Sequence, residues 1–260
     1  MRRSVVLTVA AVPLTGLLAV AMTITNGHLE AASAKVAAAK AAAAKPLPER
    51  MADTGGGTQL ITAVTNGTSN KARNGTLTWW RRDGNKWVKV GSAPAKFGTN
   101  GLSRKRVEGD GTTPAGLFTL PLAFGINADP GSKLPWNSVD KNSWWNENPA
   151  SKRYNTWHQN CPKTECWTST TKKKNASEHL ADYTPEYELA VFIGFNAKKK
   201  KVLPPAIKSG SGIFLHVSNG GYTAGCISVK KSAMKALVRW IDPAASPHIA
   251  IGNTTTITTF

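Results

Sequence analysis

Acidic side chains are scarce in this sequence. Its 260 residues include 15 Asp and Glu against 33 Lys and Arg, which gives a formal net charge of +18. An excess of this size favours an anionic partner, such as a nucleic acid, a membrane surface or an acidic wall polymer, without choosing among them. Wholesale disorder is excluded, because 41% of the residues are hydrophobic and 9 are Trp.

Charged residues are absent from the run Val5 to Ile24, which follows the cationic start Met1-Arg2-Arg3. Ala32-Ser33-Ala34 then supplies a pair of small residues, so the order of regions predicts a secretory signal peptide, residues 1–34, cleaved after the last of these alanines. The alternative is an uncleaved membrane anchor, since about 20 apolar residues can span a bilayer. Pro13 and the many small residues favour cleavage.

Export changes what the positive charge implies. The chain after residue 34 keeps 31 basic and 14 acidic residues, a net charge of +17. A secreted basic protein rarely meets its own genome, and no helix-turn-helix or zinc-finger pattern is present. We therefore expect anionic cell-wall polymers as partners, no nucleic acid, and an extracellular, wall-associated monomer with no stable membrane span after signal cleavage.

The remaining chain predicts a linker followed by one domain. Residues 35–57 begin as an Ala/Lys-rich stretch, KVAAAKAAAAKPLPER, which is typical of a semi-rigid spacer. Residues 58–260 show many short β-rich runs and no internal repeat, which indicates one mainly β domain with few helices. The expected strands are Gln59–Val64, Leu77–Arg82, Asn85–Val90, Gly116–Leu120, Glu188–Phe195, Gly212–Val217 and Thr254–Thr259. Residues 121–185 show little periodicity, and an amphipathic pattern predicts a helix over Lys230–Ile241.

Cysteine is also scarce, with 3 residues in the chain. Cys161 and Cys166 lie close together, and in an exported protein the usual state of such a pair is a disulfide. A loop this short stabilises the fold by only about 2 kcal/mol, so the bond would be a local staple. The alternative is a zinc site that adds His158 and His179, but their spacing is irregular. We expect no cofactor.

The third cysteine, Cys226, has no obvious partner. A lone cysteine can be a buried apolar residue, an intermolecular linker or a reactive thiol. Cys226 ends the glycine-rich loop Gly220–Gly225, which can turn backbone N–H groups toward one point, as an oxyanion requires. His216 lies ten residues upstream in an apolar strand. A strand, a loop and a return would bring imidazole and thiol together, which is the arrangement of a cysteine nucleophile and its base.

Several segments together resemble the L,D-transpeptidase (YkuD-like) catalytic domain of bacterial cell-wall enzymes. They are Glu108–Phe118, similar to the family's GDG-TPxGxF segment, Ser177–Leu180, the apolar strand ending in Phe192-Ile193, Gly212–His216 and Thr223–Cys226. The resemblance extends from about residue 60 to the C-terminus. It implies a β-sandwich-like domain that cuts peptidoglycan stem peptides between the third residue and the following D-alanine.

The resemblance also assigns roles to individual residues. Cys226 would be the nucleophile and His216 its base, with the backbone carbonyl of Val217 orienting the imidazole. Backbone N–H groups of Gly225 and Cys226 would bind the oxyanion. Thr223 and Tyr222 are further candidates for substrate contact, and His179 either lines the acceptor side or is a structural histidine. An amine of a second stem would resolve the acyl-enzyme into a cross-link, and water would make the protein a carboxypeptidase; a noncatalytic wall-binding protein is the third alternative.

The sequence departs from the commonest family motif, S/T-H-G-C-x-R, in two respects. Ala224 stands where the motif has its second His, and Ser228 stands where it has Arg. Only six residues separate His216 from Thr223, a spacing that resembles an actinobacterial-type branch with a short loop. These differences bear on substrate recognition more than on the nucleophile.

Overall fold

The computed structural model describes residue 28, residues 31–33, residue 35, and residues 45–166, 177–197 and 209–260. The chain divides into two units, Met1–Lys45 and Pro46–Phe260. Residues 1–27, which include most of the predicted signal peptide, and the lysine run 198–201 lie outside the described residues. In the described part, no helix combines the length and the apolar character needed to cross a membrane.

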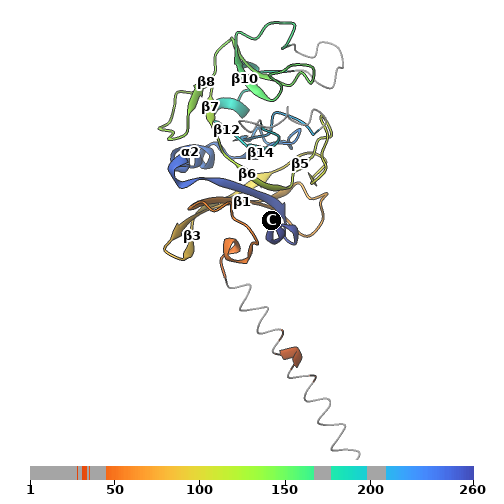
Figure 1. Cartoon of the computed structure of the whole chain (residues 1–260), viewed down its shortest axis with the longest axis vertical. Coiled ribbons are helices and arrows are strands. Elements are labelled where there is room, and N and C mark those ends of the chain that lie inside the picture. Colours follow the sequence, from red (N-terminus) through yellow and green to blue (C-terminus); the bar gives the residue numbers. More distant parts are fainter. Residues whose placement is uncertain (1–27, 29–30, 34, 36–44, 167–176, 198–208) are drawn as a thin grey trace, which may run out of the picture. The chain divides into compact units, whose positions relative to one another are not determined.

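The second unit is built on a large sheet that contains ten of the described strands, in the order β6-β15-β1-β2-β3-β14-β13-β12-β7-β8. The strands are β1 (Gln59–Thr65), β2 (Asn74–Asp83), β3 (Lys86–Lys96), β6 (Gly116–Thr119), β7 (Ala123–Gly125), β8 (Trp136–Ser138), β12 (Ala190–Phe192), β13 (Phe214–Val217), β14 (Ile227–Val229) and β15 (His248–Asn253). Figure 1 shows the sheet curling, with β1 and β3 far from β8. The predicted mainly β, sandwich-like class is confirmed.

Smaller elements flank this sheet. Two further sheets are formed by β9 (Ser143–Asn146), β10 (Thr156–Gln159) and β11 (Glu178–His179), and by β4 (Leu102–Ser103) and β5 (Thr113–Pro114). The helices of this unit are α2 (Lys231–Trp240) and the 3-10 turns η1 (Leu47–Arg50), η2 (Leu180–Asp182), η3 (Glu186–Glu188), η4 (Pro243–Ala245) and η5 (Thr256–Thr259). The small sheet with β10 lies at the opposite end of the unit from β1 and β3 (Figure 1).

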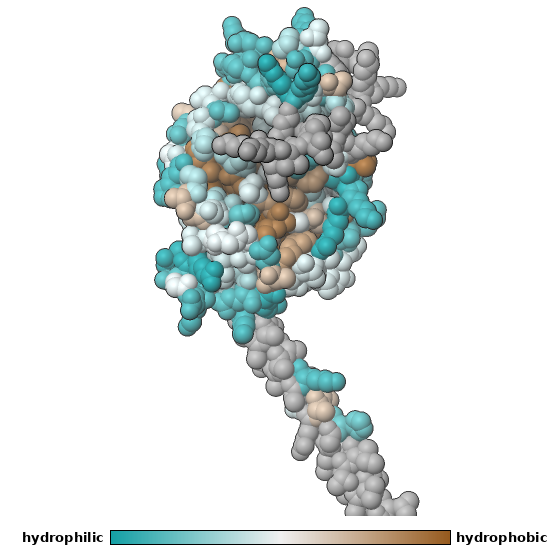
Figure 2. Space-filling view, viewed as in Figure 1, coloured by the Kyte–Doolittle hydropathy of each residue, from teal (hydrophilic) through white to brown (hydrophobic). Residues whose placement is uncertain are grey.

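Apolar alternation along the strands explains the main core. In β2, for example, Leu77 and Trp79 are buried while their neighbours Thr76 and Thr78 are more exposed. Helix α2 closes one side of this core, because Ala233, Met234, Leu237 and Val238 all point inward. The helix begins and ends within one residue of the predicted range. Figure 2 shows hydrophilic residues around the rim of one face and hydrophobic residues toward its middle.

The C-terminal strand lies earlier than the sequence predicts. We expected a strand at Thr254–Thr259, but β15 ends at Asn253 and η5 follows it. The Asn253 carboxamide oxygen accepts hydrogen bonds from the backbone N–H groups of Thr255 and Thr256, at 3.0 and 2.8 Å. An Asn side chain that bonds to the next turn in this way overrides the β preference of the threonines.

The region expected to be irregular also differs from the prediction. The described part of residues 121–185 contains five short strands, β7 to β11. A disulfide joins Cys161 to Cys166, with their Cα atoms 5.7 Å apart, just after β10. Strands of two to four residues are too short to show a period in the sequence.

Residues 46–57, which the sequence analysis assigned to the linker, pack against the domain. Leu47 and Met51 contact a small cluster that includes Leu60 and Trp87. The Glu49 carboxylate accepts a hydrogen bond of 3.1 Å from the Trp87 backbone N–H. The compact unit accordingly begins at Pro46.

The packing of α2 predicts a large effect of truncating its central side chain. Leu237 is fully buried, so Leu237→Ala should lower the free energy of unfolding by about 2–5 kcal/mol, measured by chemical denaturation. Lys235→Ala, on the exposed side of the same helix, should change it by less than about 0.5 kcal/mol. Equal effects of the two substitutions would contradict the orientation of α2.

Candidate active site

Cys226 and His216 lie in the wall of one cavity of about 160 Å³. The cavity is lined by Glu178, Tyr183, Glu186, Tyr187, His216, Asn219, Tyr222, Thr223, Ala224 and Cys226. They come from β11, η3 and its flanks, β13, and the loop that leads into β14. Four segments thus meet around the thiol that the sequence singled out.

Strand pairing at the centre of the sheet brings these residues together. β13 runs parallel to β14 and antiparallel to β12, with His216 opposite Ser228 and Ala190. Side chains alternate along a strand, so Leu215 and Val217 enter the core while His216 faces the other side. Cys226 immediately precedes β14, and its Sγ accepts a 3.3 Å hydrogen bond from the Phe214 backbone N–H.

The Cys226 thiol is protonated in this environment. It is 8% exposed, and its Sγ lies 3.3 Å from the carbonyl oxygen of Gly212, to which the S–H donates. Burial raises the pKa of the thiol, and the nearby carboxyl groups of Glu178 and Glu147 raise it further. The Phe214 N–H and the Arg106 guanidinium act in the opposite direction without reversing the shift. A base is therefore needed before this sulfur can attack.

His216 has the properties of such a base. Its Nδ1 lies 2.8 Å from the backbone oxygen of Val217, and because a carbonyl can only accept, Nδ1 carries the proton. Nε2 is then left with a lone pair. Burial lowers the pKa of His216, although the Val217 carbonyl and Glu186 partly oppose this. The imidazole is consequently neutral near pH 7 and can accept a proton.

The loop before Cys226 is held in a tight turn by Thr223. Its Oγ1 donates a 2.6 Å hydrogen bond to the Cys226 carbonyl and accepts one of 3.2 Å from the Gly225 N–H. Gly225 has a φ of +151°, and a Cβ added there would lie 2.9 Å from the backbone oxygen of Thr112. Only glycine tolerates both conditions.

The close approach of Gly225 to Thr112 shows how the segment Glu108–Phe118 contributes to the site. Asp110 accepts hydrogen bonds from the N–H groups of Val107 and Thr112, which fixes the turn of the GDG segment. The next residue, Thr113, donates through Oγ1 to the Cys226 carbonyl at 3.3 Å. Through Thr112 and Thr113, the segment Glu108–Phe118 thus contacts and supports the loop that ends at Cys226.

Glu178 and Tyr187 line the cavity although the sequence analysis did not select them. The Tyr187 hydroxyl donates a 2.5 Å hydrogen bond to the Glu178 carboxylate, and the Tyr187 ring packs edge-on against His216. Burial raises the pKa of Glu178 to about 7, and the Tyr187 hydrogen bond limits this rise. Glu178 stands beside His179 in the sequence, and a strand of two residues offers no alternation that could have separated them.

The other predicted substrate contacts have different surroundings. His179 is not among the residues that line the cavity: its Nε2 lies 2.8 Å from the Lys141 carbonyl oxygen, its Nδ1 pairs with Asp182 at 2.9 Å, and its ring packs at a tilt against Trp144. Tyr222 lines the cavity and is 40% exposed. The roles of both residues stay predictions.

Metal chemistry receives no positive support from the described part of the chain. The described residues contain no group of three or more His, Cys, Asp or Glu side chains arranged to hold an ion. Two ligands of the alternative zinc site, Cys161 and Cys166, are joined to each other.

Comparison with known proteins defines the family. The family model of the L,D-transpeptidase catalytic domain, YkuD, matches residues 67–251, and the chain belongs to this family. Among solved structures, the chain is similar to Bdellovibrio bacteriovorus Bd1075, with 17% identity and a TM-score of 0.36 over 75% of this chain and 48% of that one. It thus spans about half of that structure. No curated protein matches the sequence.

The raised pKa of Glu178 predicts a specific pH dependence of stability. The folded state holds a proton that the unfolded carboxyl releases above about pH 4.5, so this group destabilises the fold as the pH rises toward 7. Glu178→Gln should become more stable relative to the parent over that window, by about 1.4 kcal/mol per unit of pKa difference. Denaturant unfolding from pH 4.5 to 8 measures this, and a pH-independent difference would contradict it.

The close approach at Gly225 predicts that a methyl group disturbs the nucleophile loop. Gly225→Ala should reduce the acylation rate of Cys226 about tenfold or more, because the loop must move away from Thr112. Gly220→Ala is the matched control, since Gly220 also has a positive φ but has no atom within 4 Å of an added Cβ. Equal losses would show that backbone strain, and not the contact, governs the loop.

Proposed function

We propose that this protein is an exported L,D-transpeptidase that cross-links peptidoglycan stem peptides through a Cys226 thioester, with His216 as the base. The observation that carries the proposal is the shared cavity of Cys226 and His216, in which the Val217 carbonyl fixes the proton on Nδ1 of the imidazole. Membership in the L,D-transpeptidase family supports the reaction class.

The residues perform the steps of acyl transfer as follows. His216 Nε2 accepts the Cys226 proton, and the thiolate attacks the carbonyl carbon of the third stem residue. The tetrahedral oxyanion would replace Thr223 Oγ1 as the acceptor from the Gly225 N–H. The imidazolium then protonates the departing amine of D-alanine, which leaves a thioester on Cys226.

The second half of the reaction needs an amine or water. Glu178 and Glu186 both line the cavity and can attract the ammonium group of a second stem. The ammonium group first loses a proton to solvent. His216 then accepts a second proton as the neutral amine attacks the thioester, and passes it to the departing Cys226 thiolate, which regenerates the thiol. These two acidic residues are what favours transpeptidation over an L,D-carboxypeptidase, in which water would resolve the same intermediate.

The proposed setting is the cell wall. The net charge of +17 after residue 34 suits stem peptides, which carry carboxylates, and wall polymers, which carry phosphates. The predicted signal peptide would deliver the protein to that compartment.

Incubation with a disaccharide tetrapeptide, followed by mass spectrometry, tests the proposal. The parent protein should form cross-linked dimers, Cys226→Ala should form none, and His216→Asn should be slower by about 10²–10⁴-fold, because a general base is lost. The double variant Cys161→Ser/Cys166→Ser is the control; it retains Cys226 as its one cysteine and should remain active.

Other products would point to the alternatives. Tripeptide monomers without dimers would identify a carboxypeptidase. A carbapenem should form an adduct on Cys226 of the parent protein. The absence of both the adduct and any product would make the protein a noncatalytic wall-binding member of the family.

A further inference from the structure

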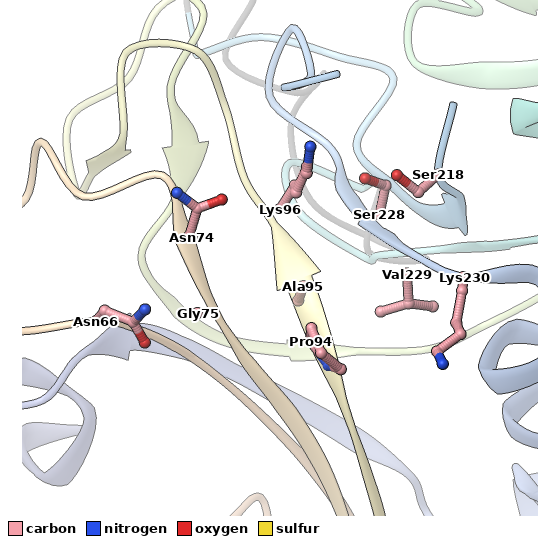
Figure 3. A pocket seen from close by; sticks show the side chains of 10 residues that line it. All are labelled: Asn66, Asn74, Gly75, Pro94, Ala95, Lys96, Ser218, Ser228, Val229 and Lys230. Carbon is pink, nitrogen blue, oxygen red and sulfur yellow. The ribbon is translucent and has the colours of Figure 1, made fainter. Parts of the chain in front are cut away.

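A second cavity, of about 340 Å³, is lined by residues of β2, β3 and β14 and of their flanking loops. Its polar lining consists of Asn66, Asn74, Lys96, Ser218, Ser228 and Lys230 (Figure 3). Neither Cys226 nor His216 lines it, so it is separate from the cavity described above.

Strand register links this cavity to the catalytic histidine. His216 on β13 pairs with Ser228 on β14, which pairs with Lys96 on β3, which pairs with Asn74 on β2. Paired residues of neighbouring strands point to the same face, and the strands are about 4.8 Å apart. Ser228 therefore lies about 5 Å from the position of His216 along this row, and Lys96 about 10 Å. In Figure 3 the side chains of Lys96, Ser228 and Ser218 rise to the same side.

The polar lining of this second cavity carries positive charge and no negative charge. It offers two ammonium groups, two carboxamides and two hydroxyls, and no carboxylate belongs to it. Among the described residues, neither Lys96 nor Lys230 forms an ion pair. A cavity lined by cations and hydrogen-bond donors fits an anion.

Ser228 adds an independent indication of a ligand. Its side chain is buried, with 2% exposure, yet its Oγ has no hydrogen-bond partner in the described structure. A buried hydroxyl without a partner destabilises the fold, so its retention calls for a partner that arrives from outside. Ser228 also stands where the family motif has Arg, and the smaller side chain leaves room in front of Lys96.

One loop forms a wall of both cavities. The Lys96 ammonium donates to the Gly220 carbonyl, and the Asn74 carboxamide donates a 3.1 Å hydrogen bond to the Tyr222 hydroxyl. Tyr222 and Asn219 of this loop line the Cys226 cavity on its other side. A ligand that extends from Cys226 past this loop would enter the second cavity.

We propose that this cavity binds a free carboxylate of the stem peptide whose reacting carbonyl lies at Cys226. The inference rests on the proposed function and deepens it. An extended peptide advances about 3.3 Å per residue and a side chain adds a similar reach, so a carboxylate on the third stem residue or on a residue beside it reaches Ser228 and Lys96. Lys96 and Lys230 neutralise the carboxylate, and the Ser228 hydroxyl donates to it.

Equilibrium binding to the Cys226→Ala protein tests this without requiring catalysis. A synthetic tetrapeptide stem, and analogues in which each carboxylate in turn is a carboxamide, are titrated by calorimetry. One carboxamide should weaken binding about tenfold or more. The variant that also carries Lys96→Met and Lys230→Met should bind the unmodified stem at least about tenfold more weakly. In this variant, replacing the recognised carboxylate by a carboxamide should weaken stem binding by less than about twofold. Lys89→Met, an exposed lysine elsewhere on β3, is the control and should leave binding unchanged.

Ser228→Ala separates a ligand contact from a structural role. It should weaken stem binding several-fold while leaving the melting temperature of the free protein unchanged or higher, because a hydroxyl without a partner is removed. A lower melting temperature with unchanged binding would overturn the role of Ser228.

Two results would overturn the proposal as a whole. One is stem binding that is insensitive to Lys96 and Lys230, or undetectable in the Cys226→Ala protein. The other is lysine-dependent binding of a glycerol phosphate polymer without lysine-dependent binding of the stem, which would assign the cavity to a wall phosphopolymer. Lysine-dependent stem binding together with a complete lack of turnover by the parent protein would retain the carboxylate site and reject the transpeptidase.

Discussion

The parallel pairing of β13 with β14 is the constraint on which the rest of the site depends. It places His216 on one strand beside the residues that follow Cys226 on the next, with the short loop Ser218–Gly225 between them. Parallel neighbours cannot be joined by a tight hairpin, so the chain must leave the sheet and return. That excursion forms part of the wall of the cavity and ends at Gly225, immediately before Cys226.

The surroundings of this pair determine its protonation. Burial disfavours both the thiolate and the imidazolium, so the resting state has a neutral thiol and a neutral imidazole. The Val217 carbonyl holds the proton on Nδ1 of the imidazole, which leaves the lone pair on Nε2. Glu178 and Tyr187 share a hydrogen bond nearby, which adds a carboxyl group that titrates near neutral pH to the same cavity.

The sequence was informative where a local pattern decides the structure. The strands at Leu77–Arg82 and Asn85–Val90, the amphipathic helix α2 and the apolar strand with His216 were all predictable, and the motif segments led to the family. The ladder between β15 and β1 was not, because parallel pairing joins residues almost 190 positions apart. Glu178 was missed in favour of its neighbour His179, since a two-residue strand does not reveal which side chain faces inward. The row from His216 to Lys96 depends on strand register, which no single segment encodes.

The central claim is that Cys226 becomes acylated by a stem peptide. The most direct measurement is peptide mapping by mass spectrometry of the protein quenched in acid during turnover of a disaccharide tetrapeptide. The account predicts one thioester-linked disaccharide tripeptide, on the peptide that contains Cys226 and nowhere else. Turnover with an unmodified Cys226 at every time point, or an acyl group on another residue, would contradict it.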